Sequence, residues 1–246
     1  MDRFWLPASA WSVSPALSGE EAHHCARVMR KGRDDEIEVF DGEGRVARAR
    51  LGEVGKQRVE LEWLGEARLV TPLRPRITLA VGIPKGKTMD LIIQKAVELG
   101  VARIVPLLSE QGVVKVEDGG RKREKWQRVA FEACKQCGQN FLPEVAEPQR
   151  VGDFLQSWQA GGGLGLVGAL RDEARALGKV LREADLTGEV GLLVGPEGDF
   201  SAAEYETAFA AGFQPVDLGD LVLRVETAAL MMVSALRCEA GARAGD

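Results

Sequence analysis

Alternating apolar and polar residues mark the N-terminal part of the chain. Segments 37–40, 46–51 and 57–64 place apolar residues at every second position, and the turn-forming run Asp41-Gly42-Glu43-Gly44 separates the first two. A period of two puts the apolar side chains on one face of a strand. We therefore predict a small antiparallel β-barrel or sheet with turns between its strands.

A short helix is predicted just before these strands. Ser18 and Glu21 have the spacing of a capping box, in which each side chain bonds the backbone N–H of the other residue. His24, Arg27 and Arg30 follow at helical spacing, so this pattern predicts that they share one helix face.

The second part of the chain alternates strand-like and helix-like segments, which is typical of a mostly parallel sheet flanked by helices. The proline-containing run 71–75 is the expected linker, and it divides the chain into domains 1–72 and 73–246. The expected strands are 77–81, 104–107, 164–167, 190–194 and 215–218, and the expected helices are 89–99, 121–137, 151–158, 202–211 and 226–240.

Two helices carry further signals. Ser201 and Glu204 form a capping-box pattern, so residues 195–199 must be the turn between a strand and that helix. The last helix is apolar on all sides from Ala228 to Val233, which is unusual for a helix with one exposed face. Burial or a subunit interface would explain this composition.

Composition restricts the possible functions. The chain has 246 residues, 45% of them hydrophobic, and a net charge of −5, so it can bury a core but does not coat nucleic acid by bulk charge. Basic residues nevertheless cluster in 23–33 and 121–128, where each cluster is either a phosphate contact or a solvated helix face. The apolar runs are too short for a membrane span, and four cysteines make no disulfide framework, so we expect a cytoplasmic protein.

Three familiar motifs are weak here. Segment 82–88 resembles a phosphate-binding P-loop but has one residue too few and a proline within it, so a basic loop near nucleic acid, or an ordinary exposed loop, is the better interpretation. Cys134 and Cys137 are expected to be buried or interfacial cysteines, and no metal site is expected. His23 and His24 are the chain's two histidines, which disfavours a serine hydrolase.

Two strand-to-helix turns near the C-terminus suit a small ligand. Gly195 and Gly198 permit close backbone approach, Pro196 stiffens the turn, and Glu197 can accept hydrogen bonds. Leu218, Gly219 and Leu223 in the second turn would complete an apolar slot for a flat ring such as adenine. Two tight turns without a ligand are the alternative.

Segments 191–200 and 218–228 together resemble the cofactor loops of the SPOUT methyltransferases, and in particular of the 16S rRNA (uracil-N3) methyltransferases called RsmE. Segments 23–33, 40–42, 95–101 and 132–138 extend the resemblance over nearly the whole chain. The sequence departs from the family pattern at Asp199, where a glycine is usual, and at Gln139, where an arginine is common.

The resemblance implies an α/β fold with two domains: an N-terminal PUA-like β-barrel that binds RNA, and a C-terminal SPOUT domain tied in a trefoil knot. It also implies a homodimer, S-adenosylmethionine as cofactor and small-subunit ribosomal RNA as substrate. The cofactor-binding residues that we predict are Gly168, Val194, Gly195, Pro196, Glu197, Gly198, Leu218, Gly219, Leu223 and Thr227.

The expected reaction is methylation of a uridine at N3, where an anion develops as the N3 proton leaves. Arg224 would stabilise that anion, and Glu226 would orient Arg224 or act as base, unless the two form a local ion pair at the helix start. The residues predicted to bind RNA are His24, Arg27, Arg30, Lys31, Lys85 and Lys87. Alternatives are another SPOUT activity on ribose 2′-O or on tRNA, a non-catalytic RNA-binding protein, and an ATP hydrolase built on the 82–88 loop.

Overall fold

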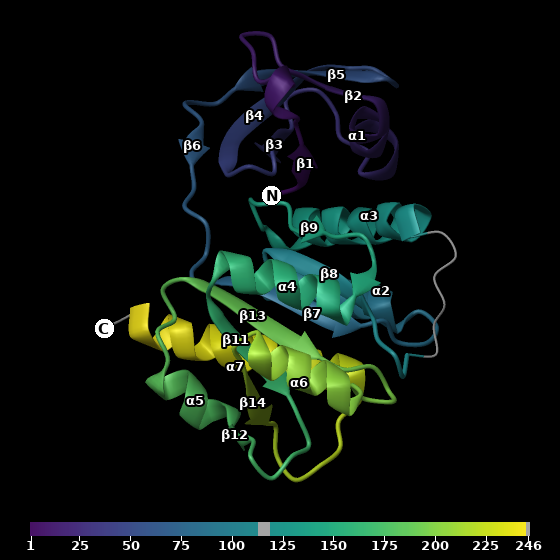
Figure 1. Cartoon of the computed structure of the whole chain (residues 1–246). Helices are drawn as coiled ribbons and strands as arrows, with labels where there is room; N and C mark the ends of the chain where they lie inside the picture. Colours follow the sequence, from purple (N-terminus) through teal and green to yellow (C-terminus); the bar gives the residue numbers. More distant parts are fainter. Residues whose placement is uncertain (113–118, 245–246) are drawn as a thin grey trace. The chain divides into compact units, whose positions relative to one another are not determined.

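The computed structural model of the protein describes residues 1–112 and 119–244, and it divides into two compact units (Figure 1). The first unit consists of Met1–Pro72 together with Cys134–Leu142. The second consists of Leu73–Ala133 and Pro143–Asp246. A segment from the middle of the chain therefore belongs to the N-terminal unit, which no pattern in the sequence indicated.

A twisted sheet with the order β1-β3-β4-β5-β2 forms the first unit, and β6 pairs with β4. β1 runs parallel to β3, and the other neighbours are antiparallel. The alternating pattern of the sequence puts Ile37, Val39, Val59 and their neighbours into one buried cluster. The strands are β1 (Arg3–Trp5), β2 (Ala16–Ser18), β3 (Glu36–Phe40), β4 (Arg45–Val54), β5 (Arg58–Trp63) and β6 (Arg68–Leu69).

The helical segment of the first unit differs from the prediction. Helix α1 spans Gly19–His23 and passes into a π-helical turn at His24–Val28, and Arg30 lies beyond it with φ of 53°. Arg30 therefore does not share a helix face with His24. The predicted capping box is also wrong, because the Ser18 side chain makes no capping hydrogen bond.

The Glu21 carboxylate is used elsewhere, which explains the missing capping box. Its Oε2 accepts from the backbone N–H of Trp5 at 2.8 Å, and its Oε1 accepts from the Lys135 ammonium at 2.6 Å. Both Glu21 and Lys135 are buried. Burying a carboxylate without a charged partner costs more free energy than leaving an exposed helix end uncapped. Glu21 therefore pairs with Lys135 and does not cap the helix.

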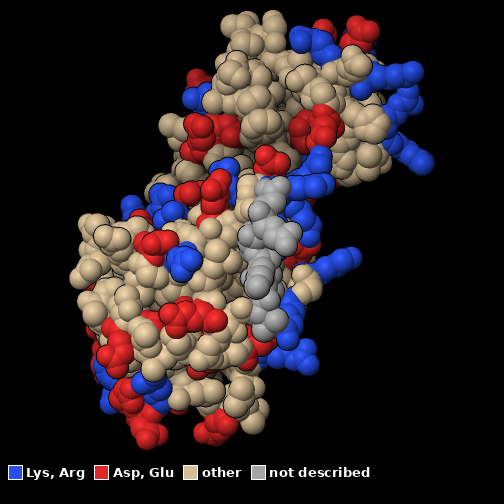
Figure 2. All heavy atoms as spheres, turned by 45° about the vertical axis from the view of Figure 1, so that its right-hand side comes forward, with Lys and Arg blue, Asp and Glu red and all other residues tan. Residues whose placement is uncertain are grey.

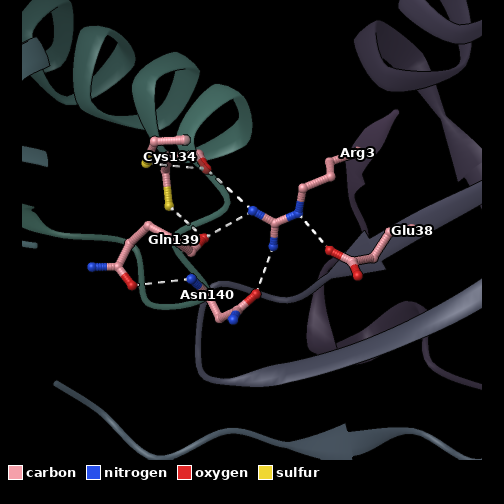
Figure 3. A network of polar contacts seen from close by, with 6 residues as sticks. Arg3, Glu38, Cys134, Gln139 and Asn140 are labelled. Carbon is pink, nitrogen blue, oxygen red and sulfur yellow. Dashed lines mark hydrogen bonds and ion pairs between the residues drawn. The ribbon is translucent and has the colours of Figure 1, made fainter. Parts of the chain in front are cut away.

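Arg3 holds the segment Cys134–Leu142 within the first unit (Figure 3). Its guanidinium pairs with Glu38 at 2.7 Å and donates to Asn140 Oδ1 at 2.6 Å. It also donates to the backbone carbonyls of Cys134 and Gln139, each at 3.4 Å. Gln139, one of the two departures from the family pattern, thus supplies a backbone acceptor to a structural network.

The prediction of buried or interfacial cysteines is confirmed for Cys134. Cys134 is buried, and burial raises the pKa of its thiol to about 12. Cys137, at the end of helix α3, is exposed, so for this residue the interfacial alternative stays a prediction. Among the described residues, no group of three or more His, Cys, Asp or Glu side chains is placed to hold a metal ion.

A parallel sheet with the order β10-β8-β7-β13-β11-β14-β12 forms the second unit, with β9 beside β8. Every pairing is parallel, which confirms the α/β fold. Its central strands β7 (Arg76–Gly82) and β13 (Glu189–Val194) are continuous apolar runs, as expected for strands covered on both faces. The others are β8 (Arg103–Leu108), β9 (Glu144–Val145), β10 (Gln149–Arg150), β11 (Leu164–Gly168), β12 (Arg175–Ala176) and β14 (Phe213–Asp217).

Helices flank this sheet near the predicted positions, with small shifts at their ends (Figure 1). Helix α5 and the two-residue strands were not predicted, because such short elements carry no measurable periodicity. The helices are α2 (Thr88–Glu98), α3 (Gly119–Cys137), α4 (Val151–Gly161), α5 (Leu177–Glu183), α6 (Ala202–Ala210) and α7 (Val225–Ala244). Within the described part of the chain, no helix is both long and apolar enough to span a membrane.

Candidate active site

A cavity of about 340 Å³ opens where three neighbouring strands end. Its walls come from the residues that follow β11, β13 and β14, which lie side by side in the order β13-β11-β14. The carboxyl ends of parallel strands are the usual ligand sites of α/β proteins, and the volume is in the range of small-molecule pockets. The fold thus brings three loops that are distant in sequence to one place.

Most of the residues predicted to bind a cofactor line this cavity. They are Gly168, Val194, Gly195, Pro196, Glu197, Leu218, Gly219 and Leu223, and the predicted catalytic residue Arg224 lines it as well. Gly198, Thr227 and Glu226 are neighbours of lining residues in sequence but do not line the cavity themselves. Lining residues that sequence reasoning missed are Ala169, Leu170, Asp199, Tyr205, Leu221, Val222, Val225 and Ala228.

The loop after β13 packs directly on the end of β7. A Cβ atom on Gly82 would come within 2.5 Å of the Pro196 nitrogen, so a side chain there would push this loop away. The backbone N–H of Lys85 donates to Glu197 Oε1 at 2.9 Å. Gly82 of the P-loop-like segment therefore permits a close approach of the cavity loop, which is a structural role for this glycine.

Helix α6 is fixed at the same loop by the predicted capping box, which the structure confirms. Ser201 Oγ accepts from the Glu204 N–H at 3.2 Å, and Glu204 Oε2 accepts from the Ser201 N–H at 2.9 Å. The other oxygen of Glu204 accepts from the Glu110 N–H, in the loop after β8, at 2.9 Å. Both ends of the β13–α6 loop are thus held in place.

The loop after β14 supplies the opposite wall. Gly219 has φ of 110° and donates its N–H to Asp217 Oδ1 at 3.0 Å, so it turns the chain in a conformation that favours glycine. Leu221 and Val222 follow, and they are 75% and 81% exposed. Large apolar side chains with this exposure beside a cavity favour a surface that binds a ligand or another protein chain.

The charged residues that line the cavity are Glu197, Asp199 and Arg224, and all three are exposed. Arg224 lies one residue before α7, and Glu226 lies in its first turn, half-buried. In the described part of the chain, no ion pair joins these two residues. The Arg224 guanidinium is therefore not engaged by the helix-start ion pair that was the alternative explanation of this motif.

Some of the residues predicted to bind RNA are exposed, and others already contact protein side chains. Figure 2 shows basic side chains gathered over the end of α1 in the first unit and over α2 and α3 in the second. Arg27, Arg30, Lys85 and Lys87 are exposed.

The other two predicted residues already have protein partners. Lys31 forms an ion pair with Asp2 at 2.6 Å, and the hydrogen bond to Asp2 raises the pKa of the Lys31 ammonium. His24 is half-buried, and its Nδ1 lies 3.3 Å from Lys135 Nζ. In this arrangement His24 Nδ1 can accept a hydrogen bond from the Lys135 ammonium. This nitrogen is then not available to donate to an RNA phosphate.

Family models match both units. Residues 71–237 match the RNA methyltransferase domain, which covers more than half of the chain, and residues 17–63 match the RNA methyltransferase PUA domain. The ribosomal RNA small subunit methyltransferase E of Synechocystis sp. is 34% identical over 233 residues, which are 94% of this chain and 76% of that protein. The chain belongs to the ribosomal RNA small subunit methyltransferase E (RsmE) family. The RsmE enzyme of Bacillus subtilis is 30% identical over the full length of both chains.

Solved structures agree with the fold. The RsmE enzyme of Neisseria gonorrhoeae, bound to S-adenosylmethionine, is 33% identical with a TM-score of 0.84, and the match covers 96% of this chain and 97% of that one. A methyltransferase structure from Legionella pneumophila in complex with the same cofactor is 31% identical with a TM-score of 0.84, covering 96% of each chain. The RsmE family, the α/β fold and the methyltransferase class that the sequence predicted are confirmed.

Proposed function

We propose that this RsmE-family protein binds S-adenosylmethionine in the cavity at the ends of β11, β13 and β14 and methylates N3 of a uridine in small-subunit ribosomal RNA. The observation that carries the proposal is the convergence of both family loops, 194–199 and 218–224, on a single cavity. The names of the relatives and the cofactor bound to the solved structures support the same conclusion.

The cavity fits the proposed cofactor by the chemistry of its walls. Gly168, Gly195 and Gly219 expose backbone groups that can bond the edges of an adenine or the ribose hydroxyls. Leu218 and Leu223 provide apolar contact for the flat base. When bound, S-adenosylmethionine supplies an electrophilic methyl group.

Arg224 is the residue that we assign to the chemistry. Uracil N3 becomes nucleophilic only when its proton leaves, and the resulting charge spreads onto O2 and O4. The Arg224 guanidinium, exposed at the cavity and without an ion pair to Glu226, can donate hydrogen bonds to such an oxygen. Glu226, in the first turn of α7, stays our prediction for the group that orients Arg224 or receives the proton.

Exposed basic residues would guide the RNA. Lys85 and Lys87 follow β7 at the same edge of the sheet as the cavity, and the backbone of Lys85 bonds the cavity residue Glu197. Arg27 and Arg30 present positive charge on the first unit. We expect all four to contact phosphates, which position a nucleic acid without reading its sequence. His24 and Lys31 stay predictions of the same kind, although each has a protein partner.

We also infer a homodimer. Leu170, Leu221 and Val222 are apolar, line the cavity and are more than half exposed. Met231, on α7, is a further exposed apolar side chain of the second unit. A second copy would cover these side chains beside the cavity, and sedimentation equilibrium tests this. The trefoil knot of the second unit and a cytoplasmic place of action remain predictions.

Titration calorimetry with S-adenosylhomocysteine tests the cofactor site. We expect saturable binding by the wild type and none by Ala228→Trp, which fills the cavity from α7. Ala210→Trp, at the exposed end of α6, is the matched control and should bind as the wild type does. A folded wild type that binds no S-adenosylhomocysteine, with or without RNA, would overturn the proposal and favour a non-catalytic RNA-binding protein.

Mass spectrometry of nucleosides then identifies the product. After incubation of small-subunit rRNA with the protein and S-adenosylmethionine, we expect a methyl group on the base of uridine. A methyl group on the ribose, or methylation of tRNA but not rRNA, would instead indicate another SPOUT activity.

A further inference from the structure

Asp199 adopts a backbone conformation that favours glycine, and its own side chain compensates for it. Its φ is 63°, in the left-handed region, where a side chain is disfavoured. Its Oδ1 accepts from the N–H of the next residue, Phe200, at 2.8 Å. A Cβ atom on Gly195 would come within 2.8 Å of the same oxygen, so the Asp199 carboxylate lies directly on the first glycine of the cavity loop.

Tyr205 fixes that carboxylate from helix α6. Its hydroxyl donates to Asp199 Oδ1 at 2.8 Å and lies 3.3 Å from the carbonyl of Gly168 at the end of β11. Tyr205 is 3% exposed, and burial, with Asp199 as a further cause, raises the pKa of its hydroxyl well above the usual value. The hydroxyl therefore keeps its proton and remains a donor at neutral pH.

Arg171 holds the tyrosine ring in turn. Its Cζ lies 4.5 Å from the centroid of the Tyr205 ring, at the distance of a cation–π contact. Arg171 follows β11, so it comes from the same loop as the cavity residues Gly168 and Leu170. Tyr205 thereby connects two of the three loops that form the cavity.

We propose that Tyr205 and Asp199 are a coupled pair of positioning residues, which holds the β13–α6 loop in the shape that binds the cofactor. The inference rests on the proposed function, because it assigns the support of that same site. The hydrogen bond from the Tyr205 hydroxyl holds the Asp199 carboxylate against Gly195, and this contact keeps the loop in one conformation. The pair acts on cofactor binding, while Arg224 acts on the chemical step.

A double-mutant cycle tests the coupling, with S-adenosylhomocysteine binding measured by calorimetry. We expect Tyr205→Phe to weaken binding about tenfold, as for loss of one hydrogen bond to a charged group. In the Asp199→Gly background, where the partner oxygen is absent, the same change should alter binding by less than about twofold. Asp199→Asn keeps an oxygen acceptor and should bind more tightly than Asp199→Gly.

Steady-state kinetics provide the second readout. We expect Tyr205→Phe to raise the KM for S-adenosylmethionine and to leave kcat at saturating cofactor nearly unchanged, because the pair positions the loop and does not touch the reacting atoms. A loss caused by general destabilisation would instead follow the fraction of folded protein, which circular dichroism measures in parallel.

Equal effects of Tyr205→Phe in the wild-type and Asp199→Gly backgrounds would overturn the inference, and the proposed function would stand if the wild type binds. Failure of the wild type to bind would overturn the proposed function itself. If Tyr205→Phe does not fold, Asp199→Asn and Asp199→Gly test the same contact with Tyr205 in place. Equal affinity of those two variants would then contradict the inference.

Discussion

At the scale of single residues, the cavity depends on places where a side chain is absent. Gly82 lets Pro196 approach, and Gly195 leaves room for the Asp199 carboxylate. Neither position has a side-chain group to offer, so the missing side chains contribute the shape of the loop. The side chain that we expect to act on the substrate is Arg224, and it lies at the surface of this glycine-built cavity.

Removal of the Arg224 guanidinium should slow the reaction without loss of cofactor binding. We expect Arg224→Ala to lower kcat by about 10²- to 10³-fold, as for loss of one donor to a developing anion. Single-turnover methylation of small-subunit rRNA measures the rate, and calorimetry with S-adenosylhomocysteine measures binding.

Arg182→Ala is the matched control for this prediction, because Arg182 is an exposed arginine on α5 that does not line the cavity. It should leave both the rate and the affinity unchanged. An unaltered rate in Arg224→Ala would remove Arg224 from the mechanism and leave Glu226 and backbone donors to be tested.

At the scale of elements, α7 connects the cavity to the core of the second unit. It begins at the cavity with Val225 and Ala228 and buries Ala229, Met232 and Val233 further along. Near its other end, Arg237 donates to the carbonyls of Leu99, Gly100, Arg74 and Pro75, at the end of α2 and before β7. The last carbonyls of a helix have no partner within it, so a guanidinium there satisfies several of them.

Loss of this contact should destabilise the second unit. Burial lowers the pKa of the Arg237 guanidinium, but the group remains charged at neutral pH. We expect Arg237→Met to reduce the free energy of unfolding by about 2–4 kcal/mol, because several half-buried carbonyls lose their donor. Urea-induced unfolding followed by tryptophan fluorescence measures this.

Arg243→Met offers a comparison on the same helix. Arg243 also caps a helix end, through the carbonyls of Leu181 and Ala184, but it is exposed. Water can replace its hydrogen bonds, so we expect a loss of about 1 kcal/mol or less. Equal losses in the two variants would mean that burial of Arg237 contributes nothing beyond capping.

At the scale of the whole molecule, the protein and its proposed RNA substrate both carry net negative charge. The net charge of −5 opposes the approach of RNA, so local basic surfaces must provide the attraction. The exposed residues Lys85 and Lys87 lie in the loop that bonds Glu197 of the cavity. We therefore expect their charge to attract RNA toward the proposed cofactor cavity.

Charge reversal of this loop should weaken RNA binding and its dependence on salt. We expect Lys85→Glu with Lys87→Glu to lower RNA affinity and to reduce the slope of log affinity against log salt by about 0.7 for each phosphate that the protein no longer neutralises. Filter binding at several salt concentrations measures both quantities, and S-adenosylhomocysteine binding should be retained.

The control pair for this prediction is Lys179→Glu with Arg182→Glu on α5, which makes the same change in net charge elsewhere on the unit. It should alter RNA affinity less and leave the salt slope nearly unchanged. If both pairs have the same effect, net charge and not a local contact governs the binding of RNA.

Local sequence patterns determined much of this protein. The period of two predicted the strands of the first unit, the alternation of elements predicted the parallel sheet of the second, and the capping box at Ser201 predicted the start of α6. The glycine-containing turns pointed to the cavity loops before any geometry was known. Each of these signals acts between residues a few positions apart, where backbone preference and amphipathic period decide the structure.

Contacts between distant residues were decided by the tertiary structure alone. The strand order β13-β11-β14 brings residues 168–170 to the two family loops, and this order is not sequential. Glu21 does not form its predicted capping box and instead pairs with Lys135, which lies 114 positions away. The Tyr205 hydroxyl, in the first turn of α6, donates to Asp199 in the preceding loop. Burial and charge pairing depend on which elements the fold places together. A sequence pattern that compares near neighbours does not predict which distant elements will be in contact.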